Sequence, residues 1–498
     1  MSSKRTYLGV DLGASSGRVL AGRFDGAKLS LEEVHRFENG GVRAGDTLYW
    51  DVLGLWNHVV DGLRAASGKL GGEIASVGVD TWGVDFGLLG SDDRLLGNPV
   101  HYRDARSNGM LEAALSVVSR EEIFAETGLQ FMEINTLYQL VGMRRQGSPL
   151  LDMADSFLMM GDLFHWLLTG EKVNELTNAT TTQFFNPSTG DWSRSLLEKL
   201  QLPTRMLRPI VQPGANLGRL RASLAEAANL HDVDVIVPGT HDTASAVMAV
   251  PAEGETSACP DWCYISSGTW SLMGVEVSSP VINDKCRGFN FTNEGGVGGS
   301  TRLLKNIAGL WLVQECRRIW KEQGRDYSWS ELVRLAQQAP PLESLIEPDH
   351  PQFVAPADMP GAIREYCRAT GQPVPGSEGA VIRTALESLA LRYRMVLSWL
   401  EELIGGRIET IHIVGGGTQN RELCQMTADA TGRRVVAGPV EATAIGNVMM
   451  QAVARGDVGG IREAREVIKH SFDVEEYRPR HTHAWDDAYA RFEKLLAA

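Results

Sequence analysis

The stretch VPGTHDTASAV, from Val237 to Val247, places a histidine and an aspartate between a Pro-Gly turn and a run of small residues. The apolar run before the turn predicts a strand, and the small residues after Asp242 are typical of a helix. Asp242 therefore stands where a strand gives way to a helix. The residues alone allow three interpretations of Asp242: a surface turn residue, the cap of the helix, or the base of an active site.

A second carboxylate, Asp11, ends an apolar strand in VDLGASSGRV, and Gly13 and Gly17 bracket the turn that follows. The N–H groups of such a turn can face phosphate oxygens, and a Cβ at either glycine would block a polyphosphate. Asp11 would repel phosphate unless a divalent cation lay between them, so we interpret it as a Mg²⁺ organiser, acting directly or through water. The alternative is an ordinary turn, because Asp and Gly are common turn formers.

Two further glycine-containing turns extend this pattern. The turn from Ser266 to Thr269 joins two apolar runs, and a pair of hairpins from two domains could grip one nucleotide. The cluster VGGGTQN, from Val414 to Asn420, follows another apolar run and has no side chains over its three glycines. Such a backbone suits a flat ring lying against it, and the alternative is a plain flexible loop.

The common nucleotide-binding signatures are missing. GLRAASGKL is the nearest match to a Walker A loop, but it has five residues between its glycines and Leu70 in place of Ser or Thr. No G-x-G-x-x-G follows a predicted strand, so a Rossmann dinucleotide site has no support.

The periodicity around these residues predicts the elements that position them. The segments TYLGVDLG, GRVLAGRFDG and LSLEEVHRFENGG predict an antiparallel start to a sheet. A helix is expected from Asp51, its N-cap, to about Ser67, and a strand ending at Thr81 follows it. The apolar face expected for this helix comprises Leu53, Trp56, Val59, Val60 and Leu63.

The second half of the chain repeats this order of elements. A hairpin is expected around Ser266 to Thr269, and the strongest helix signal leads into the strand IETIHIVGGG. That helix has one apolar face, formed by Leu386, Leu389, Ala390, Tyr393, Val396, Leu397 and Leu400. VIVPGTHDTASAVMAV and VVAGPVEATAIGNVMMQAV form a third matching pair.

The three matches predict two domains with one plan and different insertions, and chance resemblance between α/β units is the alternative. A chain of 498 residues is too long for one ordinary core. We place the boundary within VPAEGETSACPDW, which gives domains at 1–250 and 251–498.

Composition narrows the class of protein. A formal charge of -14 argues against nucleic acid as a partner, because phosphate backbones are bound through clustered Lys and Arg. No stretch approaches the roughly 18 apolar residues of a membrane span, and the first residues lack the apolar region of a signal peptide. We therefore expect a cytoplasmic protein without membrane partners. The six cysteines are thinly spread, which favours free thiols over a zinc site.

Four stretches in this order, GVDLGASSGR, GTHDTASA, SSGTWSLMG and HIVGGGTQN, resemble the FGGY carbohydrate kinases of the actin-like ATPase superfamily. The resemblance runs from about Tyr7 to Met450. DTWGVDF, LTGEKVNELTNATTTQ, NEGG and LKNIAGLWLVQE are most similar to members that phosphorylate L-rhamnulose. The resemblance implies an α/β fold with two ribonuclease-H-like domains, each a mixed five-stranded sheet flanked by helices, closing on ATP and a sugar. The sugar domain with the catalytic aspartate would be 1–250, and the nucleotide domain 251–498.

The resemblance also implies roles for individual residues. Asp242 would be the catalytic base, and Asp11 would belong to the Mg²⁺ and phosphate site. The ATP-binding residues would be Gly13, Ala14, Ser15, Ser16, Gly17, Arg18, Gly268, Thr269, Gln314, Gly415, Gly416, Gly417 and Asn420.

The residues expected around the sugar are Trp82, Gly83, Asp85, His241, Asp242, Thr243 and Asn306. An indole face suits the C–H side of a sugar, while carboxylate and guanidinium groups, including Asp104 and Arg106, suit its hydroxyls. Trp82 is equally compatible with a core position, and Asn306 with the nucleotide side. Tyr102 stands where the family often has Trp, so sugar contacts of other members are not transferred there.

Phosphoryl transfer to a sugar hydroxyl needs a carboxylate that takes the proton, with cations and N–H donors around the γ-phosphate. At the start of a helix, the N–H groups of Thr243 and Ala244 would face the phosphoryl group, and His241 would hold the sugar or orient Asp242. We therefore expect ATP-dependent phosphorylation of L-rhamnulose at its 1-hydroxyl. The alternatives are a kinase for another ketose such as L-fuculose, or an ATP-binding scaffold without transfer.

Overall fold

The computed structural model describes residues 5–70, 74–254, 256–354 and 356–497. These residues form two compact units. Unit 1 comprises Met1–Thr256, Glu276–Leu303 and Ala442–Phe472, and unit 2 comprises Ser257–Val275, Leu304–Glu441 and Asp473–Ala498. The units therefore divide the chain differently from a single boundary after residue 250, because two later segments pack into unit 1. Residue 255, within the expected boundary segment, lies outside the described residues.

Unit 1 is built on a six-stranded sheet with the order β13-β14-β6-β1-β2-β3. Strands β1, β6 and β14 run parallel, while β2, β3 and β13 are antiparallel to their neighbours. The three antiparallel strands expected at the start of the chain are thus confirmed. The strands are β1 (Arg5–Leu12), β2 (Ser16–Phe24), β3 (Leu29–Glu38), β6 (Ile74–Thr81), β13 (Asn216–Arg219) and β14 (Asp234–Ile236).

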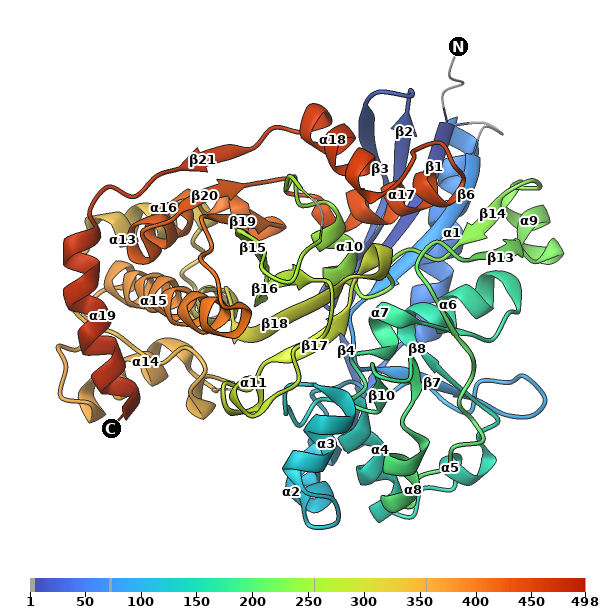
Figure 1. The fold of residues 1–498 in the computed structure, drawn as a ribbon, viewed down its shortest axis with the longest axis horizontal. Helices are drawn as coiled ribbons and strands as arrows, with labels where there is room; N and C mark the ends of the chain where they lie inside the picture. Colours follow the sequence, from blue (N-terminus) through green and yellow to red (C-terminus); the bar gives the residue numbers. More distant parts are fainter. Residues whose placement is uncertain (1–4, 71–73, 255, 355, 498) are drawn as a thin grey trace. The chain divides into compact units, whose positions relative to one another are not determined.

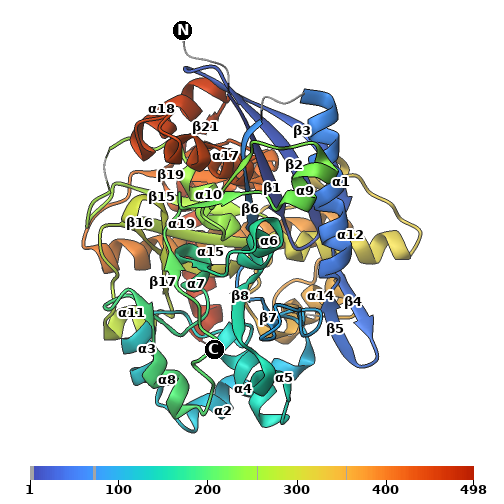
Figure 2. The same ribbon diagram turned by 90° about the vertical axis from the view of Figure 1, so that its right-hand side faces the viewer.

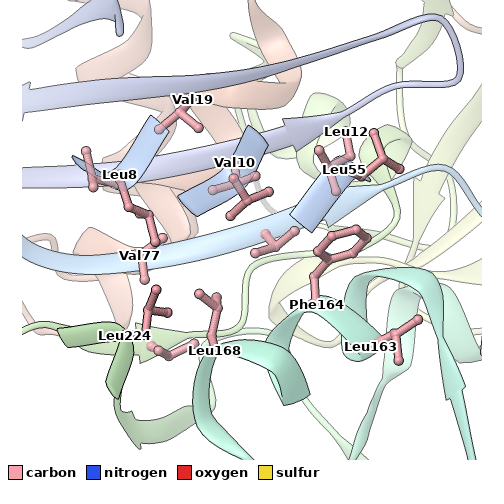
Figure 3. Close-up of a cluster of buried hydrophobic side chains, with 14 of the residues drawn as sticks. Leu8, Val10, Leu12, Val19, Leu55, Val77, Leu163, Phe164, Leu168 and Leu224 are labelled. Carbon is pink, nitrogen blue, oxygen red and sulfur yellow. The ribbon is translucent and has the colours of Figure 1, made fainter. Parts of the chain in front are cut away.

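Alternation along β1 and β6 gives this sheet two different faces. Leu8, Val10 and Leu12 of β1 point into a buried apolar cluster, together with Val77 and Val79 of β6. Figure 3 shows this cluster, in which strand side chains face Leu163, Phe164 and Leu168 of a helix. The alternate positions carry glycine and polar residues, so the second face can bear chemistry.

Helices cover both faces of the unit 1 sheet. They are α1 (Val52–Leu70), α6 (Met160–Thr169), α9 (Ala222–Ala228), α10 (Asp242–Met248), α17 (Ala442–Ala454) and α18 (Ile461–Ser471). Helices α1 and α6 bury the apolar cluster, and α1 also packs against α9 (Figure 2). The expected face of α1 is wrong at Leu53, which is 58% exposed, because the buried face begins at Val52 and Leu55.

Helices α10 and α17 pack against each other, and α17 also lies on β1 and β6 (Figure 1). The close approach depends on glycine. A Cβ at Gly446 would lie 1.8 Å from the carbonyl oxygen of Ser245, and one at Gly22 would lie 2.3 Å from Val448. The expected strand-turn-helix pair at 234–248 and 434–454 is present, and its two helices touch at these small residues.

The remaining elements of unit 1 are short. They are β4 (Gly41–Ala44), β5 (Thr47–Trp50), β7 (Phe86–Leu89), η1 (Ala105–Ser107), α2 (Met110–Leu115), α3 (Arg120–Thr127), α4 (Thr136–Arg145), α5 (Leu150–Met153), β8 (Ser156–Met159), β9 (Asn174–Glu175), α7 (Leu176–Ala179), β10 (Phe185–Asn186), β11 (Asp191–Trp192), α8 (Arg194–Lys199), β12 (Ile210–Val211), α11 (Asp284–Gly288), β17 (Thr292–Gly295) and η2 (Val297–Gly299).

Unit 2 repeats the strand order of unit 1. Its strands β18-β16-β15-β19-β20 correspond in order to β3-β2-β1-β6-β14, and β15, β19 and β20 are parallel. Strand β21 is added antiparallel to β20, as β13 is added in unit 1, so each sheet exceeds the expected five strands. These strands are β15 (Trp262–Ser267), β16 (Trp270–Val277), β18 (Thr301–Ala308), β19 (Thr410–Val414), β20 (Arg434–Ala437) and β21 (Glu475–Tyr477).

The helices of unit 2 pack around α15, whose expected apolar face is buried throughout. They are α12 (Trp311–Glu322), α13 (Trp329–Gln338), η3 (Pro351–Phe353), α14 (Met359–Ala369), α15 (Glu378–Ile404), η4 (Gly416–Gln419), α16 (Arg421–Thr431) and α19 (Thr482–Ala497). Among the helices of the described residues, none is both long and apolar enough to cross a bilayer.

The contact between α10 and α17 predicts the effect of a single methyl group. Gly446→Ala would drive a Cβ into the Ser245 backbone, and overpacking of this kind costs about 1–3 kcal/mol. The unfolding midpoint, measured by calorimetry, should fall by about 5 °C for a unit of this size. Gly68→Ala in α1 is the matched control, because its Cβ would meet nothing within 4 Å and alanine favours a helix. Equal stability of the two variants would contradict the packing described.

Candidate active site

Asp242 is the first residue of α10, directly after the turn that follows β14. The N-cap position belongs to His241, which makes no side-chain capping bond. Asp242 Oδ1 instead accepts hydrogen bonds from the N–H (2.6 Å) and hydroxyl (3.2 Å) of Thr243. The capping interpretation therefore does not describe this aspartate.

The environment of Asp242 suits a group that accepts a proton. Its side chain is 33% exposed. Burial raises the pKa of Asp242 above its ordinary value; His241 opposes this change, and the negative charge of Asp11 adds to it. A carboxylate with a raised pKa and a partly open side chain is a stronger base than a fully solvated one.

The expected phosphate donors at this helix start are already engaged. The N–H of Thr243 donates to Asp242, and the N–H of Ala244 donates to the carbonyl of His241 at 2.7 Å. The structure therefore does not leave the N–H groups of Thr243 and Ala244 free to face the phosphoryl group, as had been expected. Both N–H groups form hydrogen bonds within the tight turn that carries Asp242.

His241 is held from behind by a buried ion pair. Its Nδ1 lies 3.1 Å from Glu294 Oε2 and 3.2 Å from Arg302 Nη2, while its Nε2 lies 3.5 Å from Asp242 Oδ1. Burial would raise the pKa of Glu294, but the hydrogen bond to His241 and the charge of Arg302 outweigh it and hold the pKa below its ordinary value. An ionised Glu294 fixes the imidazole ring in one orientation.

Gly83 lies next to His241. A Cβ at Gly83 would lie 3.3 Å from His241 Nε2 and 3.1 Å from Thr181 Cγ2. The strand β6, which precedes Gly83, also forms a bridge between Thr81 and His241. The structure therefore brings together Gly83, His241, Asp242 and Thr243, four of the residues expected around the sugar.

Two more carboxylates lie on the polar face of the unit 1 sheet. Asp11 of β1 and Asp80 of β6 are register partners. Asp11 Oδ2 accepts a hydrogen bond from Arg18 Nη2 at 2.6 Å, and Asp80 Oδ2 accepts one from Asn447 Nδ2 at 2.6 Å. Sequence analysis identified Asp11 and Arg18 but missed Asp80, which lies in VGVDT as an acid ending a buried strand.

The carboxylate of Asp80 is incompletely hydrogen-bonded by the described residues. The residue is fully buried, and among the described residues its Oδ1 has no hydrogen-bond partner. Burial raises the pKa of Asp80 well above its ordinary value, and the charges of Asp11 and Asp242 add to this change. A divalent cation would relieve the repulsion among these carboxylates, and their oxygens are the ligand type of a hard cation. The described residues hold no group of three or more His, Cys, Asp or Glu side chains placed to bind a metal ion.

The turn after β1 is a tight hairpin. The N–H of Gly13 donates to the carbonyl of Ser16 at 3.0 Å, and Asn39 Nδ2 donates to the carbonyl of Gly13 at 2.7 Å. Ala14 and Ser15 at its tip are exposed. The sequence suggested that Gly17 leaves room for a polyphosphate. In the structure, a Cβ added at Gly17 would instead lie 2.2 Å from the ring of Phe37. Gly17 thus makes room for a core phenylalanine, and its contact with phosphate stays a prediction.

Asp85 is engaged by the protein rather than open to a ligand. It is fully buried, and its Oδ2 accepts hydrogen bonds from the indole N–H groups of Trp50 (2.6 Å) and Trp82 (3.0 Å). Its Oδ1 accepts one from Gln139 Nε2 at 3.0 Å. Burial raises the pKa of Asp85 to about 6, although these bonds oppose the change. The sequence suggested that the Asp85 carboxylate contacts a sugar hydroxyl. In the structure, both of its oxygens are instead occupied by hydrogen bonds from the protein.

The neighbours of Asp85 are held in the same way. Trp82 is 6% exposed and packs against Trp50 with ring centroids 4.0 Å apart and the ring planes tilted by 34°, which favours the core alternative for its indole. Asp104 accepts hydrogen bonds from the N–H groups of Leu48 and Arg106. Asp85 and Asp104 therefore set the shape of this region through hydrogen bonds within the protein.

In unit 2, the hairpin between β15 and β16 is tied to the start of α12. The N–H groups of Leu310 and Trp311 donate to the carbonyls of Gly268 and Thr269, both at 3.1 Å. Gln314 lies on the first turn of α12. This hairpin and α12 are therefore fixed relative to each other.

A cavity of about 780 Å³ opens beside this hairpin within unit 2. Gly268, Gln314, Gly416, Gly417 and Asn420 line it, all expected to bind ATP. Thr269, Gly415 and Asn306 are not among its lining residues, and Asn306 lies in β18. The cavity is large enough for a nucleoside, since ligand pockets commonly enclose roughly 300–1,000 Å³.

The glycine cluster forms one wall of this cavity. A Cβ at Gly417 would lie 2.0 Å from Ser267 Oγ at the end of β15, whereas a Cβ at Gly416 would meet nothing within 4 Å. Asn420 caps α16 by accepting a hydrogen bond from the N–H of Leu423 at 3.0 Å. Gly417 therefore lets the turn pack against β15, and Gly416 leaves the cavity open.

Other lining residues were missed by sequence analysis. Trp329, Arg334, Tyr477 and Arg480 line the same cavity. Trp329 is 50% exposed, although Arg317 lies 4.6 Å from its ring. An exposed tryptophan is a signal of binding, but its place beside Gly416 depends on the packing of α13 onto α15.

Comparison with known proteins identifies the family. The N-terminal domain of the FGGY family of carbohydrate kinases matches residues 6–249, and its C-terminal domain matches residues 263–455. A rhamnulokinase of Bacteroides thetaiotaomicron is 46% identical over 493 residues, which cover 99% of this chain and 100% of that protein. A rhamnulokinase of Bacillus subtilis is 38% identical over 474 residues, covering 95% of each chain.

Solved structures of other sugar kinases share the fold. A ligand-bound xylulose kinase from Lactobacillus acidophilus has a TM-score of 0.80 at 17% identity, covering 99% of this chain and 96% of that one. A Plasmodium falciparum glycerol kinase with ADP has a TM-score of 0.77 at 13% identity, covering 100% and 98%. The expected actin-like fold is confirmed by this likeness. From its matched domains and its relatives, this chain belongs to the FGGY family of carbohydrate kinases.

Proposed function

We propose that this chain transfers the γ-phosphoryl group of ATP to the 1-hydroxyl of L-rhamnulose, giving L-rhamnulose 1-phosphate and ADP. The names of its relatives favour L-rhamnulose among the ketoses. We further propose that the reaction takes place in the cytoplasm.

The observation that carries this proposal is the placement of Asp242. A partly exposed carboxylate stands at the start of α10 with a raised pKa, and a histidine fixed by Glu294 lies beside it. A base must lie within hydrogen-bond reach of the proton that it removes, and its pKa must be raised toward the working pH. The partly exposed side chain of Asp242 can be reached by a hydroxyl, and its buried surroundings raise its pKa.

In the proposed step, Asp242 accepts the proton of the 1-hydroxyl as the sugar oxygen bonds to the γ-phosphorus. The bond between that phosphorus and the β–γ bridging oxygen breaks, and ADP carries away the bond's electron pair. With Nδ1 accepting a hydrogen bond from Arg302 Nη2, the Nε2–H of His241 donates to the sugar or to Asp242. Gly83 leaves space for the sugar beside His241.

The nucleotide is proposed to lie in the unit 2 cavity, with its ring against Gly416 and Gly417 and near Gln314. The ATP contacts proposed for the hairpins at 13–18 and 268–269 stay predictions. Asp11 would hold Mg²⁺, with Asp80 as a second carboxylate nearby. When bound, the ion offsets the negative charge of the phosphates.

The first test measures ADP release with Mg²⁺-ATP and L-rhamnulose. The wild type should respond to L-rhamnulose more strongly than to L-fuculose, L-ribulose, D-xylulose or glycerol. Asp242→Asn should lower kcat by roughly 10²-fold or more, because the amide cannot accept the proton.

Asp284→Asn is the matched control, because the side chain of this unit 1 aspartate is 93% exposed and forms a surface ion pair with Arg287. It should retain wild-type kcat. A strong response to another ketose alone would contradict the substrate proposed. ADP release that no sugar increases would contradict the transfer reaction and favour the scaffold.

The second test narrows the unit 2 cavity. Gly416→Val would place a side chain in open space that the nucleotide is proposed to fill. The KM for ATP should rise roughly tenfold, which corresponds to about 1.4 kcal/mol, while the KM for the sugar changes little. Gly376→Val is the control, since this glycine of unit 2 also has nothing near its Cβ and does not line the cavity. An unchanged KM for ATP in Gly416→Val would place the nucleotide elsewhere.

A further inference from the structure

Glu175 is a fully buried carboxylate of unit 1 that ends β9 and caps α7. Its Oε1 accepts a hydrogen bond from the N–H of Thr177 at 2.8 Å, and its Oε2 accepts one from the hydroxyl of Thr177 at 2.6 Å. These local bonds would suffice to cap the four residues of α7. A cap alone does not require a carboxylate at a position with no solvent exposure.

The same carboxylate also reaches the turn that carries Asp242. Glu175 Oε2 accepts hydrogen bonds from both the N–H (2.9 Å) and the hydroxyl (2.7 Å) of Thr240, 65 residues along the chain. The next N–H, that of His241, donates to the hydroxyl of Thr177 at 3.1 Å. Two consecutive N–H groups before Asp242 therefore end on Glu175 and on the threonine that Glu175 holds.

The carbonyl side of the turn is held as well. The carbonyl of Thr240 accepts hydrogen bonds from the N–H of Thr81 at 2.8 Å and from Asn178 Nδ2 at 3.4 Å. Asn178 lies in α7, the helix that Glu175 caps. The peptide unit before His241 is thus fixed from one side by β6 and from the other by Glu175 and α7.

The hydrogen bonds of Glu175 are all of one kind, because every partner named here donates and the carboxylate accepts. An ionised carboxylate is acceptor-only and matches this pattern, whereas an amide would turn an NH₂ group toward one of these donors. Burial raises the pKa of Glu175, and the bonds from Thr177 and Thr240 oppose the rise. Replacing the carboxylate therefore affects the turn at Thr240, not only α7.

We propose that Glu175 is a positioning residue for phosphoryl transfer: it fixes the turn from Thr240 to Asp242 and thereby the direction of the Asp242 carboxylate. The inference rests on the proposed function of Asp242 as base. Glu175 does not touch the substrate in this proposal, so its loss should lower kcat more than it raises the KM for the sugar. Displacement of a catalytic group by about 1 Å can cost on the order of 10²-fold in rate.

The test compares Glu175→Gln with Glu387→Gln. Glu387 is the matched control, since it is also buried (1% exposed) and accepts a backbone N–H, that of Leu342, at 2.8 Å in unit 2. Both variants should lose some thermal stability. Only Glu175→Gln should lower kcat with L-rhamnulose, by roughly 10- to 100-fold, with the KM for the sugar changed less than about threefold.

A second readout does not depend on the substrate. Amide hydrogen exchange of peptides spanning 237–248, followed by mass spectrometry, should become faster in Glu175→Gln than in Glu387→Gln. Thr240→Val removes the hydroxyl donor from the other end of the contact and is the variant to use if Glu175→Gln does not fold. It should show the same changes in a weaker form, and the effects of the two substitutions should not add in the double variant.

Two outcomes would overturn the inference: exchange at 237–248 equal in Glu175→Gln and the control, or a kcat of Glu175→Gln equal to that of the control. Failure of the proposed function has a different signature, a wild type that does not phosphorylate L-rhamnulose. In that case, amide hydrogen exchange of peptides spanning 237–248 still tests whether Glu175 fixes the turn from Thr240 to Asp242.

Discussion

Helix α17 lies so close to the sheet and to α10 that three positions of unit 1 must lack a side chain. These are Gly446, whose Cβ would enter the Ser245 backbone, Gly22 opposite Val448, and Gly78, whose Cβ would lie 3.0 Å from Asn447 Oδ1. Close approach brings Asn447 within 2.6 Å of Asp80 and sets the axis of α10, whose first residue is Asp242. Tight packing of small residues thus fixes Asp242 and Asp80 together.

The cluster formed by Asp11, Asp80 and Asp242 is electrostatically costly without a partner. Burial and neighbouring like charges raise the pKa of Asp80 and of Asp242 above their ordinary values. Arg18 offsets Asp11, and Asn447 donates to only one oxygen of Asp80. The arrangement therefore favours a cation and, through it, an anionic ligand.

Most of the fold could be predicted from the sequence, because hydrophobic alternation and glycine turns act over short stretches. The hairpins, α15, and the matching order of strands in the two sheets follow from such local signals. The return of α17 to unit 1 could not be predicted, because it depends on glycines in β2 and β6 that lie hundreds of residues earlier.

The site was predictable only in part, for a similar reason. Asp11, Asp242 and the glycines of the unit 2 cavity stand at turns after strands, where chemistry can be recognised locally. Asp85 was misinterpreted because the indole that occupies its Oδ2 comes from Trp50, 35 residues away. Glu175 and Glu294 were missed because their importance depends on partners at 240 and 241 that only the folded chain brings near.

The most direct test of this account is a crystal structure of the protein with L-rhamnulose, Mg²⁺ and a non-hydrolysable ATP analogue. The account predicts that the oxygen of the sugar 1-hydroxyl lies within about 2.6–3.2 Å of the Asp242 carboxylate, on the side that faces the terminal phosphate. A sugar bound with its 1-hydroxyl turned away from Asp242, and another protein group within reach of that proton, would contradict it.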